Sequence, residues 1–325
     1  METTYVPEGQ LLTTLQNKEL TTTLTGLERA LDTGAIIECT ALLCDEQFNL
    51  HVDFPALPNV RGIIPRAETV WNRDGEPPKD IAILTRVGKA VACKVTGIEY
   101  SEESGTVVYL SRRLAQAECA ATYLAALRPG DVIRARVTHL ESFGAFVDIG
   151  CGIPSLLSVD CISVSRISHP RDRVYNGQLI WAVVKSVDHQ TGRIFVSTRE
   201  LLGTWEENAA RFTPGQTVAG VVRSVEEYGV FVELAPNLAG LAEVRDCDKE
   251  AVHSLIGRTA AVFIKSINPE RMKIKLVLID AYRGEAAPLP RLHYFIRGDE
   301  TPHIDRWVYS PAGAKKMVET VFDPL

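Results

Sequence analysis

One stretch of this sequence occurs twice, and the repeat limits the possible folds more than any other feature. The first copy opens at Pro129 and the second at Pro214, 85 residues later (214 − 129 = 85). Each copy contains an alternating strand pattern, and later a strand, a loop and a matching strand: AVVKSVDHQTGRIFVS from Ala182 and VFIKSINPERMKIKLV from Val262. A period of this length is too long for a solenoid unit and is typical of a small domain repeated in tandem.

A pair of aromatic residues stands at the same place in both copies. Residues 137–149 alternate apolar and polar side chains like a half-buried strand, and they carry Phe143 and Phe146 on either side of a glycine. Tyr228 and Phe231 lie at the same offsets from their proline, 14 and 17 residues. Such rings either fill a barrel core or offer faces on which nucleic-acid bases stack. The glycine would let a flat ligand approach the strand, and it is the repetition of the pair that favours stacking.

A pair of basic residues also recurs in both copies. Lys185 corresponds to Lys265, and eight residues after each lysine Arg193 corresponds to Lys273. Rings that stack bases and Lys/Arg side chains that contact phosphate are the two components of a groove for single-stranded nucleic acid. The repeat therefore predicts two such grooves, one in each copy.

These motifs closely resemble the S1 RNA-binding domains of bacterial small-subunit (30S) ribosomal protein S1. The resemblance rests on PGDVIRARV, FGAFVDIG, VKSVD, GRIFVS and RELLGTWEEN in the first of the two copies and on GVFVELAPNLAGLAEV in the other. It is strong for residues 128–200, good for 213–280 and weak for 34–113. It implies a mainly β fold of three tandem five-stranded OB-fold barrels joined by short helices. It also implies binding of single-stranded RNA, with messenger RNA as the partner, and no cofactor.

The resemblance further implies which residues face RNA. The family's two ring positions, its aspartate before the last turn and the basic residue after it, together with the repeated lysines, give the predicted RNA-binding residues: Phe143, Phe146, Lys185, Asp188, Arg193, Tyr228, Phe231, Lys265 and Lys273. The family often has a histidine after the third strand, where this sequence has Ser158 and Glu243. The family's aspartate becomes Asn268 in the later copy, so residues 128–200 keep the most.

The predicted organisation follows the repeat. The segments are an N-terminal arm and helix at 1–33, a degenerate first repeat at 34–113, a helical linker at 114–127, a second repeat at 128–200, a linker at 201–212, a third repeat at 213–280 and a C-terminal extension at 281–325. In the first repeat the ring pair becomes Phe48 and His51 and the surroundings are acidic. Because N-terminal repeats of the family dock on the ribosome, we expect this one to contact the 30S subunit; the alternative is weak RNA binding.

Both ends of the chain have helical signals. Four leucines recur at helical spacing before Gly34, which predicts one amphipathic helix that packs on the first repeat or docks on a partner: Leu20, Leu24, Leu27 and Leu31. After residue 281 the composition is loop-like, and Ser310 with Pro311 predicts the start of a helix. Four aromatic residues there either cover the third barrel or form a separate contact surface: Tyr294, Phe295, Trp307 and Tyr309.

The charge distribution sets the expected mode of binding. The net charge is −6, yet residues 128–199 hold nine Lys/Arg against six Asp/Glu, whereas 213–280 hold eight against nine. Condensation on duplex DNA is therefore not expected, but a local groove can still hold a single strand with modest affinity. The loop before residue 179 adds a cluster of candidate phosphate contacts, for which a solvated loop is the alternative: Arg166, His169, Arg171 and Arg173.

Other function classes find little support. Seven scattered cysteines, none in a CxxC pair, predict neither a disulfide framework nor a metal site. Phosphate-loop, zinc-protease and hydrolase motifs are absent from the sequence, and Asp148 ends a strand, where a structural role is favoured. The sequence shows no bilayer-spanning apolar run and no signal peptide, which predicts a cytoplasmic protein that does not bind a membrane. We also expect no small-molecule substrate.

The prediction from the sequence is a non-enzymatic RNA-binding protein that acts in translation on the 30S subunit. A ribosome-independent RNA chaperone, an accessory factor of RNA turnover, a nuclease and a pure protein-docking scaffold are the alternatives. Because stacking accepts every base, the motifs predict RNA binding without a strong sequence preference.

Overall fold

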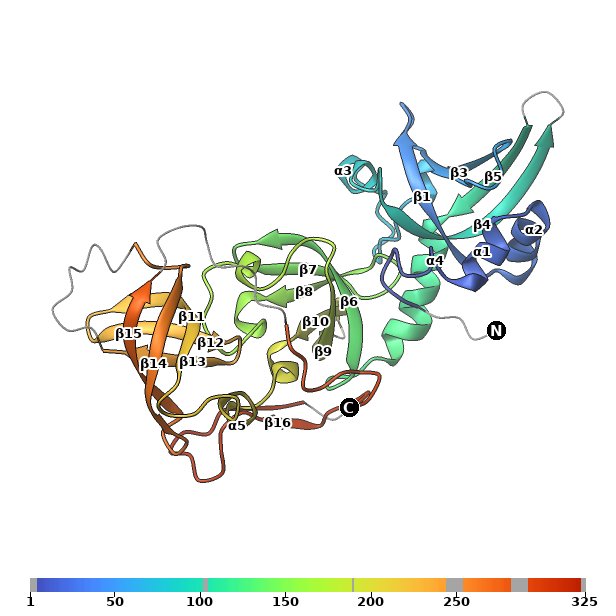
Figure 1. Ribbon diagram of the computed structural model, residues 1–325. Helices are drawn as coiled ribbons and strands as arrows, with labels where there is room; N and C mark the ends of the chain where they lie inside the picture. Colours follow the sequence, from blue (N-terminus) through green and yellow to red (C-terminus); the bar gives the residue numbers. More distant parts are fainter. Residues whose placement is uncertain (1–4, 102–104, 189, 244–253, 282–291, 323–325) are drawn as a thin grey trace. The chain divides into compact units, whose positions relative to one another are not determined.

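The computed structural model describes residues 5–101, 105–188, 190–243, 254–281 and 292–322. They form three closed five-stranded barrels, which confirms the mainly β, OB-type architecture (Figure 1). The chain divides into two compact units, the first being Met1–Leu127 with Asp148–Pro154 and the second Arg128–Val147 with Ser155–Leu325. No helix within the described ranges is long and apolar enough to cross a membrane.

The first barrel has the strand order β1-β2-β3-β5-β4. Its strands are β1 (Ile36–Cys44), β2 (Leu50–Asp53), β3 (Val60–Ile64), β4 (Ala90–Ser101) and β5 (Gly105–Ser111). The helices of the first unit are α1 (Leu15–Thr21), α2 (Leu24–Thr33), the 3-10 turn η1 (Arg66–Glu68), α3 (Asp80–Leu84), α4 (Arg112–Cys119) and the π-helical turn η2 (Ala120–Leu124).

The single N-terminal helix predicted from the leucine spacing is in fact two helices. Thr23 adopts an extended conformation between α1 and α2, and its side chain accepts a hydrogen bond from the Gly26 backbone N–H, which caps α2. Gly34 ends α2 with a left-handed φ of 64°, as expected. Leu20 and Leu27 are buried in the core of the first barrel, so the leucine face packs on the first repeat.

The second and third barrels repeat the topology of the first. The second has strands β6 (Val132–Glu141), β7 (Gly144–Asp148), β8 (Pro154–Ser158), β9 (Leu179–Asp188) and β10 (Arg193–Ser197). The third has β11 (Thr217–Glu226), β12 (Gly229–Ala235), β13 (Leu238–Ala242), β14 (Thr259–Asn268) and β15 (Lys273–Ala281). In every barrel the third and fifth strands pair in parallel, and the fourth and fifth pair antiparallel.

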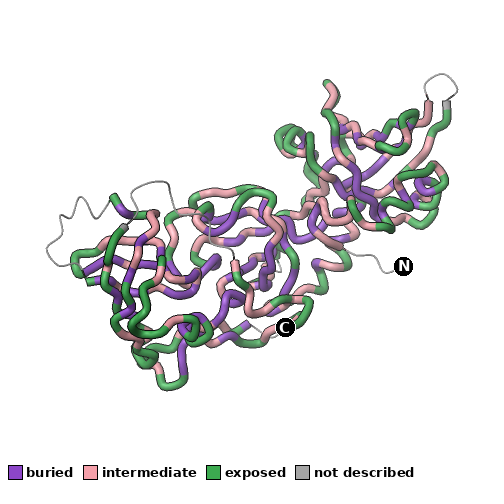
Figure 2. Tube along the Cα trace, viewed as in Figure 1, coloured by how far each residue is buried: buried purple, intermediate pink, exposed green. Residues whose placement is uncertain are grey.

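Short helical turns connect these strands. They are η3 (Val159–Cys161), η4 (Pro170–Asp172), η5 (Arg199–Leu202) and α5 (Trp205–Ala209). The cores are filled by alternate apolar strand residues, such as Val222, Val230 and Val232 in the third barrel, all fully buried. Figure 2 shows the buried positions following the strands of each barrel. This alternation leaves the other face of each strand for surface contacts.

The C-terminal extension packs along the second unit instead of forming the predicted helix. It pairs β16 (Arg306–Val308) with β17 (Glu319–Val321), and the Ser310 hydroxyl accepts from the Val318 N–H at 2.7 Å within the connecting turn. The helix expected after Ser310 is therefore wrong, because Trp307 and Tyr309 gain burial in the third barrel's core when this segment runs as a hairpin.

The aromatics of the extension cover both barrels of the second unit. Trp307 and Tyr309 belong to the third barrel's core cluster, whereas Tyr294 packs with Trp181 of the second barrel. The Asp131 carboxylate lies 2.6 Å from the His303 ring, which fastens the extension to the start of β6. Of the two possibilities left open by the sequence, covering is the one observed, and it extends beyond the third barrel.

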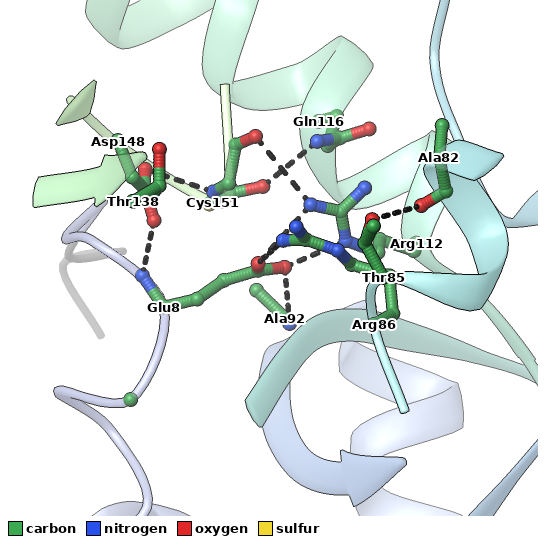
Figure 3. A network of polar contacts seen from close by, with 12 residues as sticks. Glu8, Ala82, Thr85, Arg86, Ala92, Arg112, Gln116, Thr138, Asp148 and Cys151 are labelled. Atoms are coloured by element: carbon green, nitrogen blue, oxygen red, sulfur yellow. Dashed lines mark hydrogen bonds and ion pairs between the residues drawn. The ribbon is translucent and has the colours of Figure 1, made fainter. Parts of the chain in front are cut away.

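A buried carboxylate organises the N-terminal arm of the first unit. Glu8 accepts a hydrogen bond from Arg112 Nε at 2.6 Å and lies 3.5 Å from Arg86 Nη1 (Figure 3). Its backbone N–H donates to Asp148 at 2.7 Å, and Asp148 also accepts the N–H groups of Gly150 and Gly152. Burial and the nearby Glu8 carboxylate raise the pKa of Asp148 to about 7. This geometry fits the structural role favoured for Asp148.

Candidate nucleic-acid interface

The two phenylalanines of the second barrel form an exposed ring pair. Phe143 is 53% exposed at the turn between β6 and β7, and Phe146 is half-buried on β7. Their ring centroids are 6.1 Å apart with the planes at 90°. A core phenylalanine would be enclosed, whereas an exposed ring beside a second ring offers a face to a flat ligand.

The third barrel reproduces this pair with different residues. Tyr228 is 66% exposed and meets the half-buried Phe231 edge-on, with centroids 6.1 Å apart and planes at 89°. In each barrel the strand carrying the inner ring begins at a glycine, Gly144 in β7 and Gly229 in β12. The same strand turn therefore builds the same ring geometry twice.

Gly144 has a different role from the one expected. A Cβ at this position would lie 2.6 Å from the Leu157 carbonyl oxygen and 2.9 Å from the Ser158 Cα. Gly229 would meet the Ala242 carbonyl oxygen at 2.5 Å in the same way. The glycine is required for the close approach of the neighbouring strand's backbone.

The hairpin after β9 presents Arg193. Asp188 and Arg193 are directly paired at its base, and Arg193 is exposed. The Asp188 carboxylate accepts the backbone N–H groups of Gln190 and Thr191 at 2.9 and 3.2 Å. Hydrogen bonds from the Thr191 side chain and backbone lower the pKa of Asp188. Asp188 thus orders the turn, which positions Arg193.

The third barrel has the same hairpin without the carboxylate. Asn268 and Lys273 are the paired residues at its base, and Asn268 Oδ1 accepts the Arg271 N–H at 2.9 Å. Lys265 and Lys273 are both exposed. An amide therefore replaces the carboxylate as the turn's hydrogen-bond acceptor, and the basic side chain keeps its place.

Lys185 is held more closely than its counterpart Lys265. Its Nζ lies 3.0 Å from Cys161 Sγ, beside η3, and this hydrogen bond raises the pKa of Lys185. Burial tends to raise the pKa of Asp160, but a hydrogen bond with Ser158 and the Lys185 ammonium lower it. Lys185 therefore stays charged, but part of its hydrogen-bonding capacity serves the protein.

The loop that carries the predicted arginine cluster does two different things. Arg166 and Arg171 are exposed, whereas the His169 ring accepts the Arg171 N–H at 3.1 Å and caps η4. Arg173 is buried and bonds to the Glu233 carboxylate of the third barrel. The prediction that Arg173 contacts phosphate is therefore wrong, because its guanidinium is enclosed and links the second barrel to the third.

Asn237 is a second joint between these barrels, and the sequence pattern did not reveal it. It is fully buried, accepts the Val164 N–H at 2.9 Å, and donates to the carbonyl oxygens of Arg199 and Gly203 at 2.8 and 2.9 Å. The residue lies in a tight turn after β12, where the sequence suggests only turn chemistry. Its partners come from the second repeat and the linker, which no local pattern reveals.

The corresponding residues of the first barrel form no ring pair. Phe48 has a left-handed φ of 64° and packs partly against the core, with the Arg66 guanidinium 4.9 Å above its ring. His51 lies 3.0 Å from the Asp45 carboxylate. The first barrel thus keeps the fold without the aromatic platform.

Comparison with known proteins agrees with this geometry. Residues 126–199, which contain the second barrel, match the model of the S1 RNA binding domain. The small ribosomal subunit protein bS1 homolog of Bacillus subtilis is 28% identical over 244 residues, covering 72% of this chain and 59% of that protein. Small ribosomal subunit protein bS1 of Staphylococcus aureus is 32% identical over 197 residues, covering 59% and 48%.

The chain spans about half the length of these relatives. A solved structure of a multidomain protein with nucleic acid binding domains from Streptococcus pneumoniae is 14% identical, covers 76% of this chain and 73% of that chain, and has a TM-score of 0.23. The sequence relatives confirm the resemblance to ribosomal protein S1. The domain family that matches the second barrel is named for RNA binding, not for an enzymatic reaction.

Proposed function

We propose that the second and third barrels bind single-stranded RNA by stacking bases on their two ring pairs. The observation that carries this proposal is the recurrence of one geometry: an exposed ring perpendicular to a half-buried one, with centroids 6.1 Å apart in both barrels. Each platform is sequence-tolerant, because every base has a π face. The S1 RNA binding domain match over the second barrel supports the same function.

Basic side chains beside the rings supply phosphate contacts. Arg193, Lys265 and Lys273 are exposed at the corresponding hairpins of the two barrels. Lys185 contributes a charge from beside η3, while Asp188 acts through the turn that positions Arg193. The exposed Arg166 and Arg171 extend the basic surface along the loop before β9. Few phosphate contacts predict modest affinity and a shallow salt dependence.

The biological role we propose is in translation, on messenger RNA at the 30S subunit. The similarity to bS1 proteins supports it, and the first barrel, which has no ring pair, is the part proposed to contact the subunit. A ribosome-independent RNA chaperone or turnover factor would use the same ring pairs without that contact. A protein-docking scaffold would not need the rings at all.

The ring proposal is tested by titrating a fluorescent single-stranded RNA and the matching duplex with the wild-type chain and with the double variant Phe143→Ala/Phe146→Ala. Stacking contributes about 1–3 kcal/mol per base, so the variant should bind the single strand at least about tenfold more weakly. Tyr100→Ala is the matched control, since this ring is 61% exposed in the first barrel, outside both ring pairs. Equal affinities for wild type, control and double variant would contradict stacking on this pair.

The ribosomal part is tested by co-sedimentation with 30S subunits. We expect the full chain to sediment with them, and a chain without residues 1–113 to remain in the free fraction while still binding RNA. Recovery of the full chain only in the ribosome-free fraction would favour the ribosome-independent alternatives.

A further inference from the structure

A third aromatic ring adjoins the ring pair of the second barrel. His139 on β6 stacks on Phe146, with ring centroids 6.5 Å apart and planes inclined by 24°. The half-buried Phe146 thus has the imidazole nearly parallel to it and the Phe143 ring edge-on to it. The His139 side chain is 60% exposed, so most of its surface is open to a ligand.

The strand register explains why the residue at this position reaches the inner ring. In the third barrel Ser224 is directly paired with Phe231, next to a shift of the β11–β12 register between Val222 and Ser224. His139 and Ser224 hold the same place in the repeat, ten residues after their prolines (139 − 129 = 10; 224 − 214 = 10). Besides carrying Tyr228 in place of Phe143, the third barrel therefore has a hydroxyl where the second barrel has an imidazole.

One hydrogen-bond partner orients the imidazole. His139 Nε2 lies 2.8 Å from Glu141 Oε1, two residues further along the same strand. This contact and the stack on Phe146 hold the ring nearly parallel to Phe146 before any ligand arrives. A preoriented side chain loses less rotamer freedom on binding, which favours its use as a contact surface.

We propose that His139 is an RNA-contacting residue of the second barrel, which stacks a further base beside those on Phe143 and Phe146. The inference rests on the proposed RNA-binding function and deepens it, because it assigns the second barrel one more stacked base than the third. The two barrels are then unequal sites, with the second as the stronger one.

The test compares His139→Ala and His139→Phe with the wild-type chain in titrations of a single-stranded RNA of uniform sequence. His139→Ala should raise Kd about fivefold or more, the lower limit for one stacked base, and His139→Phe should stay within about twofold of wild type. Ser224→Ala is the matched control at the corresponding position of the third barrel and should leave Kd unchanged. In proton NMR, the ring protons of His139 should move upfield when RNA is added.

The outcomes separate this inference from the proposed function. If His139→Ala binds like wild type while Phe143→Ala/Phe146→Ala does not, the role of His139 is overturned and the ring-pair function stands. Loss of binding in both His139→Ala and His139→Phe would also overturn stacking by this ring. If the phenylalanine pair has no effect either, the proposed function itself fails.

Discussion

Gly144 lies where the neighbouring strands β7 and β8 approach each other backbone to backbone. Its place between two rings suggests a space for a flat ligand, but the adjacent backbone of β8 occupies that space, with the Leu157 carbonyl oxygen 2.6 Å from where a Cβ would be. The sequence identifies the glycine because it repeats, whereas its function depends on a strand contact that only the folded barrel contains. The rings on either side of it do lie together at the surface, as the repeat predicts.

Replacing this glycine should therefore damage the fold. Gly144→Ala forces the β7 and β8 backbones apart, and we expect a loss of about 1–3 kcal/mol in the free energy of unfolding, as for overpacked sites. Gly97→Ala is the control, because only a side-chain carbon of Tyr109, at 4.0 Å, lies near the place that its Cβ would take. Urea unfolding of both variants measures the difference; equal midpoints would show that β8 can move aside at little cost.

Asp148 makes a pH-dependent contribution to stability. Burial and Glu8 raise its pKa to about 7 in the folded state, above the value of about 3.9 in an unfolded chain. The resulting stabilisation is complete below the unfolded pKa and is lost as pH rises through 7. The free energy of unfolding of the first unit should therefore fall by about 2 kcal/mol between pH 5.5 and 8 from this group.

The substitution Asp148→Asn removes the carboxyl group whose pKa is raised, and with it this contribution to the pH dependence of stability. Urea unfolding at both pH values should show a smaller difference for the variant than for wild type, with a remainder from Glu38, whose pKa burial raises to about 6. The variant's absolute stability can be lower, since Asp148 accepts three backbone N–H groups. An unchanged pH difference would mean that Asp148 does not hold the raised pKa.

At the scale of elements, the strands were predictable and the connections between barrels were not. Alternating apolar residues and the 85-residue period carry the barrel topology, because both are local or repeated signals. The hairpin of β16 and β17 and the turn at Asn237 depend on burial against distant strands, so propensity at Ser310 and Pro311 predicted a helix that does not form. Arg173 likewise has a partner 60 residues away.

The joint at Asn237 has a measurable consequence. Asn237→Ala leaves the Val164 N–H and two carbonyl oxygens without their partner, which should cost about 1–3 kcal/mol in the free energy of unfolding of the second unit. When the two barrels are held less firmly, an RNA strand bound to one barrel has a lower effective concentration at the other. Affinity for a strand long enough to cover both ring pairs should therefore fall, while affinity for a strand that covers one should not.

Asn237→Asp serves as the companion variant, because it keeps the oxygen that accepts the Val164 N–H and loses the donor. It should bind the long strand more weakly than wild type as well. If both variants bind long and short strands like wild type, the orientation of the barrels does not matter for RNA.

At the scale of the whole molecule, three barrels share one topology but present different side chains at the corresponding surface. The second and third barrels expose ring pairs and are joined by Arg173, Asn237 and the C-terminal extension, whereas the first barrel has neither Phe48 nor His51 in such a pair. A string of barrels can in this way separate RNA binding from a second contact. The sequence predicted that Phe48 and His51 replace the rings in the first repeat, but the contacts between the second and third barrels became evident only in the structure.

The most direct test of the account removes all four rings together. The variant with Phe143, Phe146, Tyr228 and Phe231 each replaced by alanine should retain the far-UV circular dichroism of the wild type, because two of the rings are exposed and the other two lie outside the buried barrel cores. Fluorescence titration with a single-stranded RNA that covers both barrels should show Kd raised by at least about a hundredfold, since several stacked bases are lost. A folded variant that binds this RNA within about threefold of wild type would contradict the claim that the ring pairs are the RNA-binding surface.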